Sequence, residues 1–205
     1  MKWFYSFIWH LVRYKSQILF GMHAEGHDNI PMTGPILVAV NHQSYFDPPF
    51  TSVMIKREMH FFAKQELFGV FGLGRLITKL NAIPVRRGTY DPRSLSRVFE
   101  VLEKGGGLII FPEGTRNNGQ EFLKPKPGIG LIARKSSTAI VPAYVYRTNK
   151  IWGALLARRR MKIVFGQPIS VEQINQFSDD KEGYRSLADL VMERIKQLKF
   201  ITIGS

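Results

Sequence analysis

His42 and Asp47 are the residues best suited to chemistry, and they lie five positions apart in the segment Asn41–Pro48. Histidine readily accepts a proton near neutral pH. A carboxylate on its other ring nitrogen would fix the tautomer and stabilise the imidazolium, so the pair could activate a hydroxyl group that belongs to the substrate. Structural alternatives remain open: Asp47 before Pro48 could cap a helix, and His42 could be an ordinary loop histidine.

Two further segments carry side chains that could bind an anionic substrate. Arg86 and Arg87 follow an apolar run directly and should point to opposite sides, so that one could reach a site; the alternative is two solvated arginines. In the segment 111–117, Gly114 permits a close backbone approach, and Thr115 and Arg116 offer hydrogen-bond donors. Arginine can hold a phosphate group with two parallel hydrogen bonds. The alternative for this segment is a plain turn.

The elements that must position these residues alternate between strands and helices. We expect strands at 36–40, 60–63, 82–86, 108–111, 140–146 and 161–165, and helices at 48–57, 66–79 (interrupted by glycine), 94–104, 128–135 and 184–198. This pattern predicts an α/β fold with a mostly parallel sheet flanked by helices. Ligands bind such sheets outside the carboxyl ends of the strands, where the segments above lie. Pro142, inside a strand, indicates a sheet edge or a bulge.

The first 20 residues contain seven aromatic residues, three basic residues and no acidic one. The uncharged run 3–12 is too short for a membrane-spanning helix, which needs about 20 residues, and no signal-peptide cleavage site follows it. On a helix, Phe4, Phe7, Ile8 and Leu11 share one face, which is typical of an amphipathic helix at a membrane interface. The alternative is a helix that packs on the protein's own core. We expect residues 1–30 to form this segment and residues 31–205 the α/β domain.

The net charge of +13 is concentrated in one part of the chain. Residues 122–171 contain ten basic residues and no acidic one, whereas the other 155 residues contain 19 basic and 16 acidic residues. Such a field attracts phosphate groups on nucleic acid, anionic lipid or a phosphorylated substrate. The chain contains no cysteine, which excludes a disulfide scaffold, a thiolate nucleophile and a cysteine-based zinc site.

Taken together and in this order, four segments resemble the sequence blocks of the glycerolipid acyltransferase family. They read NHQSYFDP, NAIPVRRG, FPEGTRN and IVPAYV, and they run from Asn41 to Val145. The resemblance implies that His42 is the general base and that Asp47 orients it. The sn-2 hydroxyl of lysophosphatidic acid would then attack an acyl thioester, carried by acyl carrier protein or coenzyme A, without an acyl-enzyme.

The resemblance also implies an acceptor site, and neither a metal nor a cofactor. The implied acceptor-binding residues are Arg87, Glu113, Gly114, Thr115 and Arg116, with Lys124 and Lys126 as helpers. The fourth block, marked by Pro142, has a less defined role that could concern the donor. Arg86 occupies a position that is often acidic in the family.

The basic stretch fits the surface of an anionic membrane, to which cations add about 1 kcal/mol each. The resemblance implies a monotopic protein at the cytoplasmic face of a bacterial inner membrane. Arg158–Arg160, after the apolar residues 151–156, could form a second membrane-facing patch or a solvated turn.

Two other functions remain as alternatives, and the oligomeric state is left open. One is an acyltransferase for another lysophospholipid or for lyso-ornithine lipid. The other is a non-catalytic module that binds polyanions. The second gives no reason for the pair of His42 and Asp47. Because no nucleic-acid-binding signature is present, we expect no nucleic-acid partner.

Overall fold

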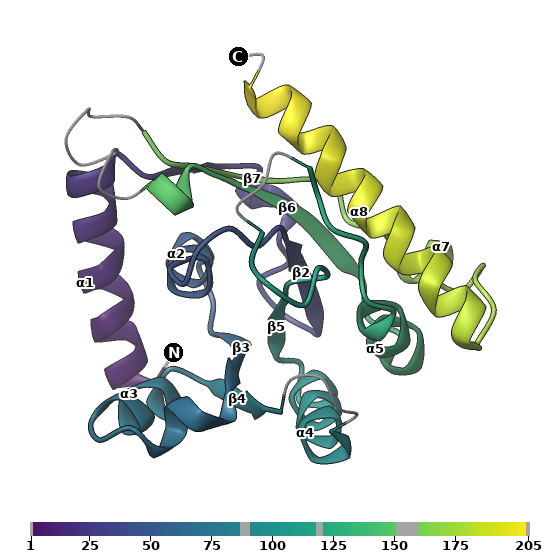
Figure 1. Cartoon of the computed structure of the whole chain (residues 1–205), viewed down its shortest axis with the longest axis horizontal. Helices are drawn as coiled ribbons and strands as arrows, with labels where there is room; N and C mark the ends of the chain where they lie inside the picture. The colour runs from purple at the N-terminus through teal and green to yellow at the C-terminus, as the bar shows by residue number, and fades with distance from the viewer. Residues whose placement is uncertain (1, 87–90, 118–120, 151–159, 204–205) are drawn as a thin grey trace.

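Seven strands form one sheet through the middle of the protein (Figure 1). The computed structural model describes residues 2–86, 91–117, 121–150 and 160–203. The strands lie in the order β1-β7-β6-β2-β5-β3-β4. Their bounds are β1 His23–Glu25, β2 Ile36–Val40, β3 Met59–Lys64, β4 Ala82–Val85, β5 Gly107–Ile110, β6 Ile140–Tyr146 and β7 Lys162–Phe165. Every neighbouring pair is parallel except β6 with β7, which confirms the mostly parallel sheet.

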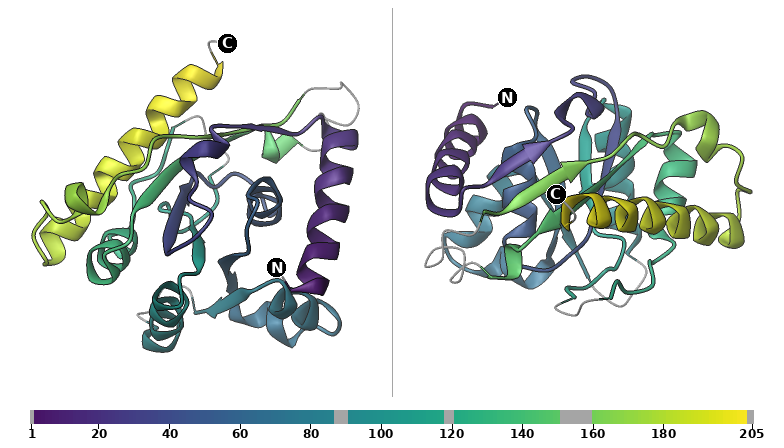
Figure 2. Two further views of the ribbon diagram at one scale, coloured as in Figure 1. Left: turned by 180° about the vertical axis from the view of Figure 1, so that it is seen from behind. Right: turned by 90° about the horizontal axis from the view of Figure 1, so that it is seen from above.

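Helices cover both faces of this sheet, with α1 and α2 on one side and α4, α5 and α8 on the other (Figures 1 and 2). The α-helices are α1 Trp3–Phe20, α2 Asp47–Met54, α3 Leu73–Lys79, α4 Pro92–Glu103, α5 Gly128–Ser136, α7 Val171–Ile174 and α8 Lys181–Ile203, and the 3-10 helices are η1 His27–Asn29, η2 Gln65–Gly69 and η3 Thr148–Lys150. Side chains of β2 alternate between the two sides. Val38 packs in the core beside α1 and α2, while Leu37 packs in the core beside α4, α5 and α8. A strand buried on both faces explains why this segment is apolar throughout.

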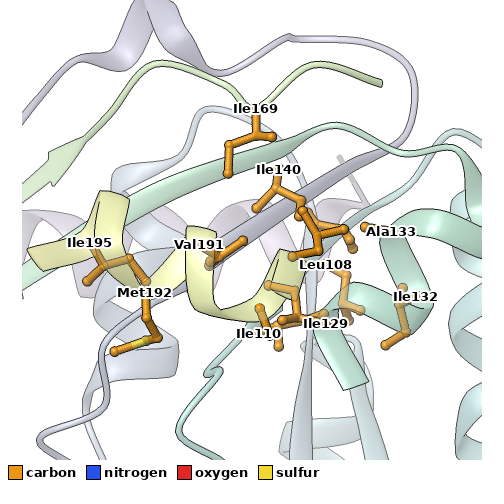
Figure 3. Close-up of a cluster of buried hydrophobic side chains, with 14 of the residues drawn as sticks. Leu108, Ile110, Ile129, Ile132, Ala133, Ile140, Ile169, Val191, Met192 and Ile195 are labelled. Atoms are coloured by element: carbon orange, nitrogen blue, oxygen red, sulfur yellow. The ribbon is translucent and has the colours of Figure 1, made fainter. Parts of the chain in front are cut away.

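The second core lies between the sheet, α5 and α8 (Figure 3). Leu108 and Ile140 from the sheet meet Ile129 of α5 and Val191 of α8, and all four are almost fully buried. Burying each such side chain stabilises the fold by about 1.5–3 kcal/mol. Gly130 lets the two helices approach closely, because a Cβ atom there would lie 2.1 Å from the carbonyl oxygen of Tyr184. The core therefore holds the sheet, and with it the strand ends, in place.

Two expected helices show how local signals set the element bounds. In α4 the Asp91 side chain caps the N-terminus by accepting a hydrogen bond from the Ser94 backbone, and Pro92 occupies the first turn. Gly105, with φ of 73°, ends it. The expected helix at 66–79 is divided into η2 and α3, and Gly72, with φ of 75°, stands between them.

The expectation of a sheet edge or bulge at Pro142 is wrong. β6 lies inside the sheet, and Pro142 pairs with Ala39 of β2. Its carbonyl oxygen accepts a hydrogen bond from the Gly166 backbone, one position beyond the β6–β7 ladder. In another residue, the backbone N–H at this position would donate a second hydrogen bond to the Gly166 carbonyl oxygen. Proline lacks this N–H, so a single hydrogen bond is lost, at the point where the β6–β7 ladder ends.

The helix α1 packs on the protein along one face and exposes apolar side chains along the other. Tyr5 and Trp9 are buried in the core beside α2. The Trp9 indole donates to the carbonyl oxygens of Ser52 and Ile55, which satisfies acceptors at the C-terminal end of α2. The opposite face exposes Trp3, Phe7, Leu11, Tyr14, Ile18 and Leu19. The alternative of a helix that packs on the protein's own core is thus confirmed for one face, and membrane contact by the exposed face stays a prediction.

The range 1–30 also contains β1, which pairs with β7 at the edge of the sheet. Among the described helices, none combines the length and the apolar character that crossing a bilayer requires.

Candidate active site

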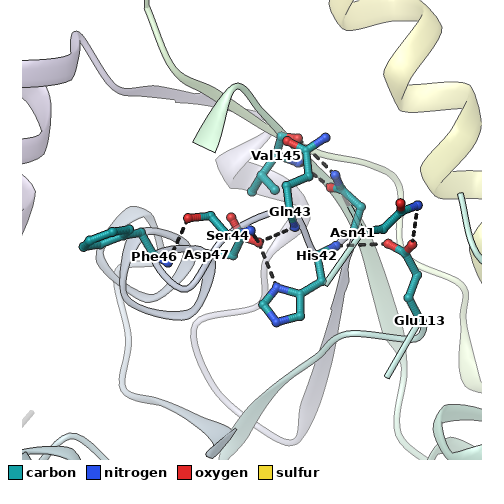
Figure 4. Close-up of polar contacts among 9 residues, drawn as sticks. Asn41, His42, Gln43, Ser44, Phe46, Asp47, Glu113 and Val145 are labelled. Atoms are coloured by element: carbon teal, nitrogen blue, oxygen red, sulfur yellow. Dashed lines mark hydrogen bonds and ion pairs between the residues drawn. The ribbon is translucent and has the colours of Figure 1, made fainter. Parts of the chain in front are cut away.

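His42 and Asp47 lie at the carboxyl end of β2, where the chain enters α2. The Nδ1 atom of His42 is 2.8 Å from Oδ2 of Asp47, and both residues are buried. The same carboxylate oxygen accepts hydrogen bonds from the backbone N–H groups of Gln43 and Ser44, at 2.6 and 2.7 Å. Asp47 is the first residue of α2, and its carboxylate bonds the loop before the helix (Figure 4). The loop is therefore folded around the carboxylate that faces the ring.

The orientation of the His42 ring leaves its second nitrogen free of Asp47. The ring stacks on Phe111, with centroids 4.1 Å apart and an angle of 25° between the planes. Because an ionised carboxylate only accepts hydrogen bonds, Nδ1 is assigned as the donor, and Nε2 keeps a lone pair that can accept a proton. Nε2 points away from Asp47 (Figure 4). This arrangement has the geometry of a general base with an orienting carboxylate.

Glu113 ties the third sequence block to the first. Its side chain is 2% exposed and accepts hydrogen bonds from the His42 backbone at 3.1 Å, the Asn117 side-chain amide at 3.2 Å and the Leu123 backbone at 3.1 Å. The Asn117 backbone donates to the His42 carbonyl oxygen at 2.7 Å. The expected acceptor-binding residue thus has protein partners for its carboxylate, and it positions the backbone of His42.

The fourth block supports the same loop from the other side. The Asn41 side chain donates to the carbonyl oxygen of Val145 at 3.1 Å and accepts from the Val145 backbone at 2.7 Å. Burial and the neighbouring Tyr146 raise the pKa of Tyr144 to about 12, so this phenol stays neutral. Sequence reasoning assigned no role to Asn41. The amide pairs with a strand 104 residues away, and no local pattern reveals such a partner.

Arg116 lies at the surface beside the first block. Its guanidinium carbon is 3.5 Å from the centroid of the Tyr45 ring, and one of its N–H groups donates to the Tyr45 hydroxyl at 2.8 Å. Tyr45 is a contact that sequence reasoning missed, although it lies inside the first block. Arginine carries five N–H donors, so the stacked guanidinium keeps donors for an anion.

The remaining residues of the third block form an exposed turn beside Arg116. Gly114 has φ of 68°, and a Cβ atom there would lie 3.1 Å from the side chain of Lys126. Glycine is thus required both by the backbone conformation and by the packing of the lysine stem. Thr115 and Lys124 are exposed.

The second block includes the edge strand β4 and Arg86 directly after it. Arg86 is exposed, and its Nε atom donates to the side chain of Gln65 at 2.8 Å. Arg87 lies outside the described residues, as do Arg158 and Arg159; Arg160 is exposed. The strand order puts two strands, β5 and β3, between β2 and β4.

Comparison with known proteins identifies the family. The family model described as Acyltransferase matches residues 21–146. The chain belongs to the acyltransferase family. The resemblance of the four blocks is therefore confirmed, and so is the expectation of an acyltransferase enzyme.

Three known proteins are similar to this member of the acyltransferase family. The 1-acyl-sn-glycerol-3-phosphate acyltransferase of Bacillus subtilis is 27% identical over 180 residues, covering 87% of this chain and 88% of that protein. The lyso-ornithine lipid O-acyltransferase of Pseudomonas aeruginosa is 30% identical over 119 residues, covering 57% and 45%. The crystal structure of the LPA acyltransferase PlsC from Thermotoga maritima superimposes with a TM-score of 0.69 at 23% identity, covering 95% and 81%. This last likeness shows that the fold is shared.

Proposed function

We propose that this protein transfers a fatty acyl group from an acyl thioester to the sn-2 hydroxyl of lysophosphatidic acid, which gives phosphatidic acid. The observation that carries the proposal is the buried contact of 2.8 Å between His42 and Asp47 at the carboxyl end of β2. The similarity to the Bacillus subtilis protein, over most of both chains, supports the choice of acceptor.

In the proposed reaction His42 is the base. The acceptor hydroxyl gives its proton to Nε2 while its oxygen attacks the thioester carbonyl. A carbon–oxygen bond forms, the carbon–sulfur bond breaks, and the leaving thiolate takes the proton from the imidazolium. Asp47 stabilises the imidazolium between these steps and keeps Nδ1 protonated. No acyl-enzyme is needed, because the acceptor hydroxyl itself is the nucleophile.

The acceptor phosphate would be bound by Arg116, with Thr115 beside it. Arg116 stacks on Tyr45, and the backbone of the next residue, Asn117, bonds the His42 carbonyl oxygen, so Arg116 belongs to the loop that lies against His42. Arg87 and Lys124 remain candidates for the same phosphate. Lysophosphatidic acid carries its phosphate only a few bonds from the reacting hydroxyl, which suits this arrangement.

The direct test is an assay of the purified full chain with lysophosphatidic acid and either acyl carrier protein or coenzyme A thioesters. We expect phosphatidic acid with at least one donor. Another lysolipid acceptor is the alternative, supported by the similarity to the lyso-ornithine lipid enzyme. Faster turnover of lyso-ornithine lipid or of a lysophospholipid without a phosphomonoester would contradict our choice of acceptor.

We also propose that residues 1–30 bind the anionic surface of a membrane, at the cytoplasmic face of a bacterial inner membrane. The exposed apolar face of α1 supports this. A second exposed apolar group lies below it (Figure 1), in the turn between η2 and α3 and on α3 itself: Val70, Phe71, Leu73 and Leu76. The Lys79 ammonium lies 4.7 Å from the centroid of the Phe4 ring, and this contact joins α3 to α1.

The membrane proposal predicts that Phe7→Ser combined with Ile18→Ser weakens binding to vesicles that contain phosphatidylglycerol. Both side chains are more than half exposed, so the melting temperature should stay close to that of the wild type. Flotation of the purified protein with vesicles measures binding, and Gln17→Ser on the polar side of α1 is the control. Unchanged flotation of the double variant would contradict the proposal.

A further inference from the structure

A cavity of about 750 Å³ lies beside the carboxyl end of β4 and the N-terminal end of α4, apart from the site around His42. Its lining includes three arginines, one carboxylate and two neutral polar side chains: Arg86, Arg93, Arg97, Asp91, Gln65 and Ser94. The cavity lies at the same edge of the sheet as His42, because β2, β5, β3 and β4 all run parallel.

The charges in this cavity are unbalanced. The Asp91 carboxylate already accepts hydrogen bonds from the Ser94 backbone, the Ser94 hydroxyl and the Arg86 backbone, as part of the cap of α4. Within the described residues, none of the three guanidinium groups forms an ion pair with a carboxylate.

Arg93 and Arg97 lie four positions apart, so they share a face of α4 and repel each other. Arg86, directly after β4, lines the same cavity, and its Nε atom donates a hydrogen bond to the neutral side chain of Gln65. An anion with several oxygen atoms would relieve the repulsion, and a phosphate matches the planar fork of arginine.

The strand order separates this cavity from the strand that precedes His42. Three strand spacings of about 4.8 Å divide β2 from β4, or about 14 Å in all. The phosphate of lysophosphatidic acid is only a few bonds from the hydroxyl that His42 would deprotonate. An acceptor held at His42 with its phosphate on Arg116 leaves this cavity open to a second anion.

The donor carries a phosphate at a suitable distance. Acyl carrier protein and coenzyme A both present the thioester on a pantetheine arm that ends in a phosphate. This arm is a little longer than four peptide units, so it spans about 15 Å when extended. We propose that Arg86, Arg93 and Arg97 bind the phosphate at the end of the donor's pantetheine arm. The inference rests on the proposed function, and it assigns the donor to a subsite separate from that of the acceptor.

A binding experiment tests the site without turnover. Calorimetric titration of the full chain would compare 4′-phosphopantetheine with pantetheine, which lacks the phosphate. We expect the phosphorylated form to bind about tenfold more tightly or better. The double variant Arg93→Gln with Arg97→Gln, and separately Arg86→Gln, should remove most of this difference. All three side chains are exposed, so we expect the variants to fold.

The control variant removes the same charge elsewhere. Arg185→Gln combined with Arg194→Gln changes two exposed arginines on α8, on the far side of the molecule from β4 (Figure 1). It should keep the wild-type preference for phosphopantetheine. Equal binding of both ligands to the wild type, or an unchanged preference in the cavity variants, would overturn the proposal.

Kinetics then identify the source of the phosphate. In the Arg93/Arg97 double variant we expect the donor KM to rise about tenfold, while the acceptor KM and kcat change little. A rise with acyl carrier protein alone assigns the cavity to that carrier, and a rise with both donors assigns it to the shared arm. A rise in the acceptor KM instead would overturn the proposal. If the wild type acylates no lysophosphatidic acid, the proposed function fails, while the titration still decides the cavity.

Discussion

Asp47 and Glu113 are two buried carboxylates with similar numbers of hydrogen bonds and different partners. Asp47 binds the His42 ring and two backbone groups of the loop before α2. Glu113 binds the His42 backbone, the Leu123 backbone and the Asn117 amide. The first carboxylate acts on a side chain that can carry a proton, whereas the second acts only on the framework that holds it. Under the proposed function, the same chemical group serves chemistry in one segment and architecture in the other.

His42→Ala should have the largest effect, because it removes the group that both carboxylates position. We expect kcat to fall by a factor of about 10² to 10⁴, the usual contribution of a general base. Turnover of lysophosphatidic acid by the purified variant measures this, and circular dichroism checks that it is folded. Wild-type turnover in a folded variant would rule out the assignment of the base.

Asp47→Asn tests the chemical side of the comparison. The amide keeps the shape of the side chain but lacks the negative charge that stabilises the imidazolium and holds Nδ1 protonated. We expect kcat to fall by about 10² or more, with little change in the acceptor KM. If kcat were to fall no further than in the Glu113→Gln variant, the two carboxylates would have the same role.

Glu113→Gln tests the architectural side. The glutamine amide nitrogen would face one of the N–H groups that now donate to the carboxylate. Two donors cannot bond each other, so a buried N–H group would lose its acceptor. We expect the free energy of unfolding to fall by about 1–3 kcal/mol, as measured by urea denaturation. The loss of kcat should be smaller than for Asp47→Asn. A stable variant with a kcat as low as that of Asp47→Asn would show that Glu113 takes part in the chemistry.

Arg116→Ala extends the comparison to the exposed part of the site and should act on binding. We expect the KM for lysophosphatidic acid to rise about tenfold, with a smaller change in kcat.

Tyr45→Phe keeps the ring under the guanidinium of Arg116 and removes only the hydroxyl that accepts its hydrogen bond, so the KM for lysophosphatidic acid should rise by about threefold. Steady-state kinetics with lysophosphatidic acid and with monoacylglycerol, which lacks the phosphate, measure both effects. An acceptor KM unchanged by Arg116→Ala would remove Arg116 from the phosphate site.

Much of the fold was predictable because most of the longer strands and helices have a strong local pattern, whereas the short elements β1 and α7 were not expected. The run 36–40 is apolar at every position, as a strand buried on both faces must be. The helix at 94–104 has a capping aspartate before it and a glycine stop after it. The prediction of a sheet edge or bulge at Pro142 failed. The cost of a proline in a strand depends on where the hydrogen bonds to the neighbouring strand end, and here that is decided by β7.

The composition of the candidate site could be read from residue types and spacing, since a histidine and a carboxylate on a strand-to-helix loop limit the possible chemistry. The partners of Asp47 are local, whereas those of Asn41 and Glu113 depended on contacts between segments far apart in the chain. Asn41 bonds Val145, and Glu113 bonds His42 over 71 residues. That Glu113 ties a loop to the third block is decided by the packing of β5 beside β2, which brings the His42 backbone to its carboxylate. In the same way, the helical pattern of α1 identified apolar faces, and only packing against α2 decided which one is buried.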